Sequence, residues 1–177
     1  MTEYTILTKV LNKPGVLNKI ASLMRRKMYN INTLTVCQSV TPGISKMTIT
    51  LFSDSPEEIK QVLKQLEKIP EVITAVNLDP EKSFWREVAI IKCSLLASKI
   101  NSLRHKFDLQ ILREKKNAII LQVSGTSNAI DEFIGSIGMK NILDISRSGV
   151  TALEEDKLQN ILDEEAQINA EKITTSF

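Results

Sequence analysis

Residues that carry most enzyme chemistry are scarce in this chain. Its 177 residues include one histidine, His105, and two cysteines, Cys37 and Cys93, far apart in the sequence. Zinc sites need histidine and cysteine clustered at short spacing, so we predict no metal site. His105 stands between two basic residues, which is typical of a solvated position. The cysteines lie among apolar residues and are predicted to be core thiols of a cytoplasmic protein.

Other catalytic signatures are missing too. The six glycines form neither a phosphate-binding loop nor a Gly-x-Ser-x-Gly elbow. The carboxylates are interspersed with lysines, as on a solvated surface, whereas general acid–base catalysis needs them in a desolvated cleft. We therefore predict no catalytic residue in this chain.

Aromatic residues and long apolar runs are also rare. A sheet that binds single-stranded RNA stacks bases on aromatic side chains of its central strands, and here those strands offer only Tyr4 and Phe52. We expect no nucleic-acid partner, although a net charge of +2 neither requires nor excludes one. No apolar run approaches the roughly 20 residues of a membrane helix. The first residues lack the pattern of a signal peptide, so no membrane association is expected.

What the sequence does contain is a regular order of elements. Alternating or β-branched residues predict strands at 4–11, 30–38, 45–52 and 72–78. Helical spacing of apolar residues predicts a helix over 16–27. A second helix is predicted after Ser55, which can cap it, with Pro56 at its first position and Glu58 completing a capping box.

The second half repeats this order. Strands are predicted at 87–95, about 108–114, about 118–124 and 142–150, with a short helix through Ile100 and a helix capped by Ser127. The predicted fold is α+β, with two tandem ferredoxin-like βαββαβ units, each an antiparallel sheet with helices on one face. We place the units at 1–79 and 86–152, a linker at 80–85 and a charged helical or frayed tail at 153–177.

Apolar residues on two predicted strands also suggest self-association. Two helices cannot cover all the strand faces that carry Leu34, Val36, Ile49 and Leu51, so we expect a second copy to cover part of them.

The loop Asn12-Lys13-Pro14-Gly15-Val16-Leu17 is the unusual feature. The backbone N–H groups and dipole of the helix that Gly15 opens favour a carboxylate, and glycine leaves room for it. Asn12 and Asn30 offer amides, and Val16, Leu17 and Ile31 could form an apolar wall. This set suits a small aliphatic amino acid. Spacing alone leaves the alternative open that Pro14-Gly15 is a tight turn and both asparagines are caps.

Several stretches resemble known families. The loop at 12–17 resembles the effector loop of ACT domains, which are amino-acid-sensing βαββαβ modules. Residues 26–36, 45–49 and 147–150 resemble the small subunit of acetolactate synthase (acetohydroxyacid synthase), and 86–92 and 125–127 resemble the second domain of that family. The similarity runs in order over about residues 3–152.

The resemblance implies a regulatory, non-catalytic subunit in the biosynthesis of valine, isoleucine and leucine. Such a subunit activates a large catalytic subunit that holds thiamine diphosphate, FAD and magnesium, and in many members it conveys feedback inhibition by valine. In that family ACT domains pair in a homodimer with the effector at the interface. Asn12, Pro14, Gly15, Val16 and Leu17 would then come from one chain.

Asn30 and Ile31 would come from the other chain of the dimer. Two positions depart from the family pattern, because Met28 replaces a usual glycine and Cys37 a usual smaller residue. Both flank the implied site and leave the effector's identity open. The stoichiometry with the large subunit and the role of the tail are open too. The alternative function is a free-standing ACT-type sensor that regulates another enzyme.

Overall fold

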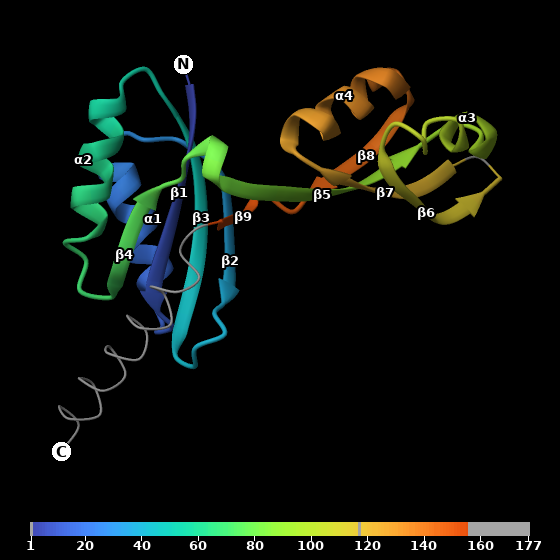
Figure 1. Cartoon of the computed structure of the whole chain (residues 1–177). Coiled ribbons are helices and arrows are strands. Elements are labelled where there is room, and N and C mark those ends of the chain that lie inside the picture. The colour runs from blue at the N-terminus through green and yellow to red at the C-terminus, as the bar shows by residue number, and fades with distance from the viewer. Residues whose placement is uncertain (1, 117, 156–177) are drawn as a thin grey trace. The chain divides into compact units, whose positions relative to one another are not determined.

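The computed structural model describes residues 2–116 and 118–155. The chain forms two compact units, one made of residues up to Phe84 and again from Ala152, the other of Trp85–Thr151. Figure 1 shows the course of the chain through both. Each unit is described by itself.

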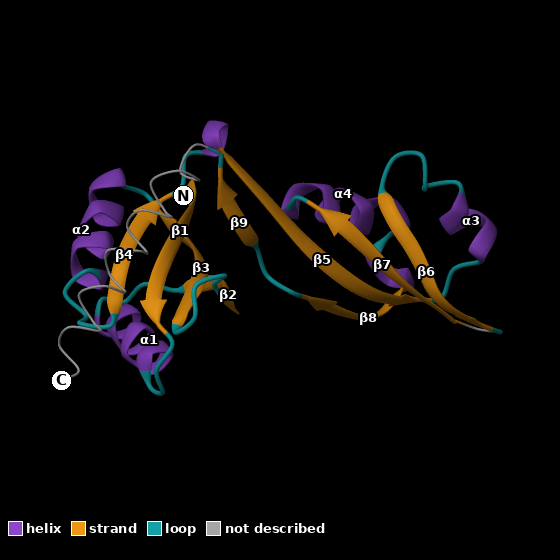
Figure 2. Ribbon diagram, turned by 60° about the horizontal axis from the view of Figure 1, so that its bottom comes forward, coloured by secondary structure: helices purple, strands orange, loops and turns teal. Residues whose placement is uncertain are grey.

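The first unit is a four-stranded antiparallel sheet with two helices on one face (Figure 2). Its strands lie in the order β2-β3-β1-β4. In chain order the elements are β1 (Thr2–Leu11), α1 (Val16–Arg26), β2 (Ile31–Gln38), β3 (Ile44–Ser53), α2 (Pro56–Leu66) and β4 (Val72–Asn77). The predicted βαββαβ order is confirmed for this half.

The core of this unit lies between the sheet and the two helices. Alternate strand residues such as Ile6, Ile49 and Leu51 are fully buried there against Ile20 of α1 and Leu66 of α2, as the two-residue period of a strand requires. Of the four residues expected to be only partly covered by two helices, Ile49 and Leu51 are thus covered within one chain. Their own helices reach them because both lie on β3, an interior strand.

The edge strand β2 keeps apolar surface. Leu34 is half-buried, and Val36 remains 45% exposed. The exposed apolar surface that motivated the expectation of a dimer is thus confined to the edge of the sheet.

The start of α2 follows its sequence signals with one correction. The Ser55 hydroxyl accepts a hydrogen bond from the Glu57 N–H at 3.2 Å, and Pro56 occupies the first position. The predicted reciprocal bond from Glu58 is wrong, because the Ser55 N–H donates to Ser53 Oγ at 3.2 Å. Glu58 instead accepts a hydrogen bond from the Ser53 hydroxyl.

The second unit repeats the first, with strand order β6-β7-β5-β8. The strand residues Ile91 and Leu121 and the helix residue Phe133 are fully buried, and Phe107 meets Phe133 edge to face at 5.3 Å. The tandem fold is therefore confirmed. In chain order the elements after β4 are η1 (Pro80–Lys82), β5 (Ser83–Cys93), α3 (Ala97–Asn101), β6 (Asp108–Lys115), β7 (Ala118–Gly125), α4 (Ser127–Ile137), η2 (Met139–Asn141), β8 (Ile142–Arg147) and β9 (Thr151–Glu154).

Segment boundaries differ from the prediction in three places. The predicted linker 80–85 is a short 3₁₀ turn followed by the start of β5. The predicted strand 142–150 ends at Arg147, because Gly149 has φ +76°, and the chain resumes as β9 where a helical tail was expected. The rest of the predicted tail, from 156, lies outside the described residues. Thr126, not Ser127, caps α4, by accepting from the Ala129 N–H at 3.2 Å.

Candidate functional site

The loop between β1 and α1 lies against the hairpin that joins β2 to β3. The Asn12 N–H donates a hydrogen bond to the Gly43 carbonyl at 2.8 Å, and the Lys13 N–H donates to Leu11 at 2.8 Å. These bonds hold the loop beside the end of β2, although β2 and β1 are not neighbours in the sheet.

Gly15 is the N-terminal cap of α1. Its backbone is left-handed, with φ +86° and ψ −10°, and no side chain caps the helix. A Cβ at this position would meet no atom within 4 Å. Glycine is thus favoured by the backbone conformation, and the space beside Gly15 is open. The N–H groups of the first turn that follow Val16 have no side-chain cap and are available to an anion.

The other loop residues divide into exposed and buried. Asn12 and Pro14 are exposed, and Leu17 is 44% exposed. Val16 is only 2% exposed and belongs to the core. The side chain of Val16 is therefore not placed to meet a ligand, and its N–H donates to the Lys13 carbonyl at 3.4 Å, while Leu17 can offer apolar contact.

Asn30 and Ile31 lie at the other end of the same sheet. Ile31 pairs with Leu51, and Leu51 pairs with Tyr4 near the start of β1, whereas the loop follows Leu11 at its end. Seven residues of strand separate Tyr4 from Leu11, which is about 23 Å at 3.3 Å per residue. One chain does not bring the two halves of the expected site together.

Met28 forms the turn between α1 and β2. It has φ +60°, the one positive φ at a non-glycine residue in the described ranges, and it is 90% exposed. The Met28 N–H donates to Arg25 at 3.1 Å and the Tyr29 N–H to Met24 at 3.0 Å. These two bonds define a Schellman motif, whose left-handed position favours glycine. Met28 therefore occupies a position at which glycine would be unstrained.

The second unit contains a buried ion pair that the sequence did not reveal. Glu87 on β5 is 2% exposed. Arg147 at the end of β8 donates to it from Nε at 2.8 Å and from Nη2 at 2.6 Å, and from Nη1 to Asp131 of α4 at 2.6 Å. The Ser127 hydroxyl also donates to Glu87, at 3.0 Å. Three family-like stretches, 86–92, 125–127 and 147–150, thus meet at one point.

Electrostatics explain the stability of this pair. The Arg147 guanidinium lowers the pKa of the Glu87 carboxyl against the opposing effect of burial, with help from Ser127 and the Gly149 N–H. Glu87 in turn raises the pKa of Arg147. The pair joins β5, α4 and β8, so we assign it a structural role.

Residues considered for other chemistry are scattered. Among the described residues no group of three histidine, cysteine or acidic side chains could hold a metal. His105 is exposed, as predicted. Cys93 is buried, and burial raises the pKa of its thiol. Cys37 is exposed because it lies on the edge strand β2, so its prediction as a core thiol is wrong. No helix in the described ranges is long and apolar enough to span a membrane.

Comparison with known proteins assigns the family. Residues 6–74 match the family model for an AHAS small subunit-like ACT domain, and residues 86–156 match that for the small subunit of acetolactate synthase. The acetolactate synthase small subunit of Bacillus subtilis is 31% identical over 83% of this chain and 87% of the relative. The chain belongs to the acetolactate synthase small subunit family.

Other members agree with this assignment. The probable acetolactate synthase small subunit of Methanothermobacter thermautotrophicus is 33% identical, over 85% of this chain and 91% of that protein. The crystal structure of the Thermotoga maritima acetolactate synthase small subunit matches with TM-score 0.79 and 32% identity, over 87% of this chain and 98% of that one. The resemblance seen in the sequence is therefore confirmed, and it supports the role of a regulatory subunit.

Proposed function

We propose that this chain activates the large catalytic subunit of acetolactate synthase and conveys feedback inhibition by valine. Membership of the small subunit family supports the partnership. The thiamine diphosphate, FAD and magnesium of the reaction would belong to the catalytic subunit, and this chain would supply regulation alone.

The observation that carries the effector site is the uncapped start of α1. Gly15 leaves the first N–H groups without a side-chain partner, and these groups favour the carboxylate of an amino acid. The Asn12 amide oxygen can accept from the ammonium group. Exposed Leu17 would contact an aliphatic side chain.

A second copy is needed to complete the site. β2 is an edge strand and can pair with β2 of another chain. An antiparallel, two-fold pairing of Ile31–Gln38 would place the start of β2 in the second copy opposite Gln38. Gln38 pairs with Ser45, and Ser45 with Val10, beside the effector loop. Asn30 and Ile31 of the second copy would then approach the loop, and exposed Val36 would be covered.

The first experiment titrates this chain into the catalytic subunit. Acetolactate formation should rise with added chain, and valine should lower it. Coupling between effector and partner of about 1–3 kcal/mol corresponds to a change of roughly 5–150-fold. No activation at saturating chain would refute the partnership. Valine binding by calorimetry without any effect on the synthase would favour the free-standing sensor.

A matched pair of variants tests the effector loop. Gly15→Asp places a carboxylate near the proposed carboxylate site, while Gly15→Asn has the same size without the charge, and both residues tolerate positive φ better than most. Gly15→Asp should abolish valine binding and inhibition, and Gly15→Asn should retain more of both. Equal losses in the two variants would show backbone strain and not an anion site.

Complementation tests whether two chains share the site. Neither Gly15→Asp nor Asn30→Ala alone should bind valine. A refolded mixture of the two should regain about a quarter of the sites, because each mixed dimer has one intact site. If the mixture regains none, the two halves do not come from different chains.

A further inference from the structure

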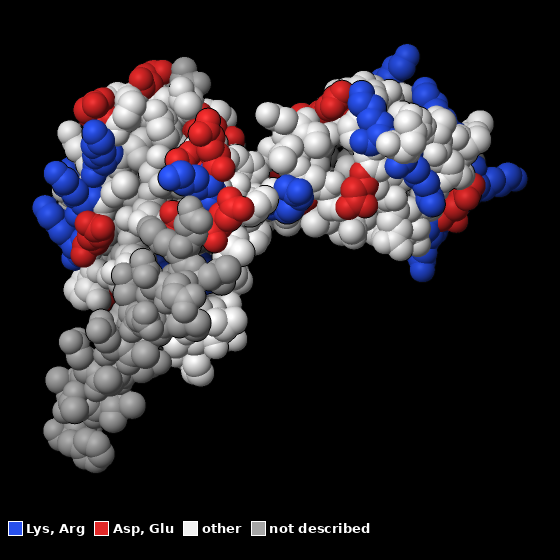
Figure 3. Space-filling model, in the orientation of Figure 1, with Lys and Arg blue, Asp and Glu red and all other residues white. Residues whose placement is uncertain are grey.

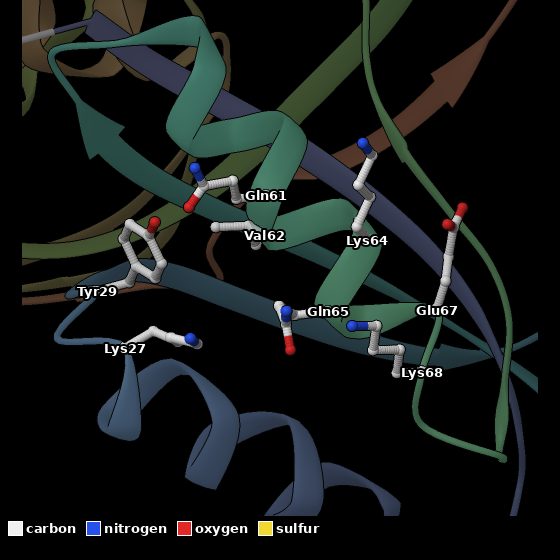
Figure 4. Close-up of a pocket in the computed structure, with 8 residues that line it drawn as sticks. All are labelled: Lys27, Tyr29, Gln61, Val62, Lys64, Gln65, Glu67 and Lys68. Atoms are coloured by element: carbon white, nitrogen blue, oxygen red, sulfur yellow. The ribbon is translucent and has the colours of Figure 1, made fainter.

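A basic groove lies between α1 and α2 in the first unit. Its volume is about 430 Å³, and its lining includes Lys27, Tyr29, Gln61, Gln65 and Lys68. Figure 4 shows Lys27 and Lys68 extending into the space between the two helices, with Gln65 between them. Two further lining residues, Lys64 and Glu67, point away from α1 in the same view.

The groove combines positive charge with apolar walls. The methylene stems of Lys27 and Lys68 and the half-buried ring of Tyr29 are apolar, whereas the two ammonium groups are cationic. Burial and the nearby Glu58 raise the pKa of Tyr29, so its hydroxyl stays a donor at neutral pH. Figure 3 shows basic side chains gathered along the side of this unit where α2 lies. The groove therefore suits an acidic amphipathic segment.

The chain itself contains such a segment after Glu155. Residues 156–177 carry five acidic side chains against the two basic ones Lys157 and Lys172. Leu158, Ile161 and Leu162 in this segment recur at helical spacing. The second family model ends at residue 156, so the segment is an addition to the shared part of the fold. Its charge is opposite to that of the groove.

We propose that the acidic segment 156–177 docks into the groove between α1 and α2 of its own chain. The occupant would contact Lys27 and Tyr29, which flank the strained turn at Met28. The inference goes beyond the proposed function and does not depend on it, because it needs neither valine nor a catalytic partner.

The length of the segment is sufficient for this contact. Glu155 is held in the first unit by its N–H bond to the Lys82 carbonyl, at 2.9 Å. A unit of this size is about 30 Å across, whereas 22 extended residues span about 70 Å. A tethered segment has an effective concentration of about 1 mM, so an intrinsic Kd below that value keeps the groove mostly occupied.

Lysine reactivity in the full chain tests the docking. Amine labelling followed by mass spectrometry is compared between the natural chain and a chain with D163N, E164Q and E165Q. Lys27 and Lys68 should react about threefold faster in the neutralised chain, as expected if two thirds of the grooves are normally occupied. Lys60, on α2 but outside the groove lining, serves as the internal control. Unchanged rates at Lys27 and Lys68 would overturn the proposal.

Zero-length cross-linking identifies the source of the segment. Carbodiimide joins carboxylates to lysines in an equal mixture of natural and isotope-labelled chains. Links from 163–165 to Lys27 or Lys68 should join peptides of the same isotope. Lys68→Glu should lower the yield of links to Lys27, because it reverses one charge of the groove, whereas Lys60→Glu should leave that yield unchanged. Links that join different isotopes as often as the same isotope would show docking on a second copy and overturn the proposal, as would the absence of links to the groove.

Discussion

Removing the guanidinium of Arg147 should destabilise the second unit more than any exposed ion pair. In Arg147→Ala, Glu87 loses the cation that contacts its side chain, which is 1% exposed in the natural chain. The Ser127 hydroxyl and the Gly149 N–H remain as donors. The carboxylate therefore keeps two hydrogen bonds but has no charge partner in β5, α4 or β8.

The expected loss follows from burial. Breaking a buried ion pair by removing one partner costs about 3–5 kcal/mol. Because the Arg147 side chain is 32% exposed and Glu87 keeps two donors, we expect Arg147→Ala to lower the free energy of unfolding by about 2–3 kcal/mol. Glu87→Gln should cost less, about 1–2 kcal/mol, because Arg147 keeps Asp131 and access to water. We therefore predict that Arg147→Ala loses more free energy of unfolding than Glu87→Gln, although both variants break the same pair.

Urea unfolding at pH 7 measures both variants. Trp85, the single tryptophan and the first residue of the second unit, provides the fluorescence signal. Lys106→Ala is the control, because its pair with Glu132 is more than half exposed on both sides and should contribute less than about 1 kcal/mol. An Arg147→Ala variant that loses no more free energy of unfolding than Lys106→Ala would refute a buried role for the pair, as would a Glu87→Gln variant that loses more than Arg147→Ala.

Three further predictions concern acid, the α1 turn and the α4 cap. Because the folded pKa of Glu87 is lowered, its pair stabilises the fold above the unfolded pKa of about 4.3 and is lost as pH falls through the folded value. The stability gap between the natural chain and Glu87→Gln should hold from pH 7 to 5 and shrink toward pH 3; a constant gap would contradict this. Met28→Gly should raise stability by up to about 1 kcal/mol in thermal melts, since relief of left-handed strain exceeds the added unfolded-state entropy, and a lower Tm would argue against strain. Thr126→Ala should cost about 1 kcal/mol and speed exchange of the Ala129 amide, and unchanged exchange would refute its capping role.

Local patterns were enough to predict the elements and the family. Alternation in β1 and β3, helical spacing in α1 and α2, and the Ser55-Pro56 start were read correctly because each depends on neighbours in the chain. Gly15 was identified as the opening of α1 for the same reason. Boundaries set by long-range pairing were missed, as where β5 replaces the expected linker at Ser83.

Only the tertiary structure decided how the candidate residues are distributed. It buries Val16 in the core and separates Ile31 from Leu11 by the length of the sheet. It also joins Glu87 to Arg147 across 60 positions of sequence. Sequence spacing determines which face of an element a residue occupies. Which element lies opposite is set by packing between distant segments, so a shared site and a buried ion pair become visible only in the folded chain.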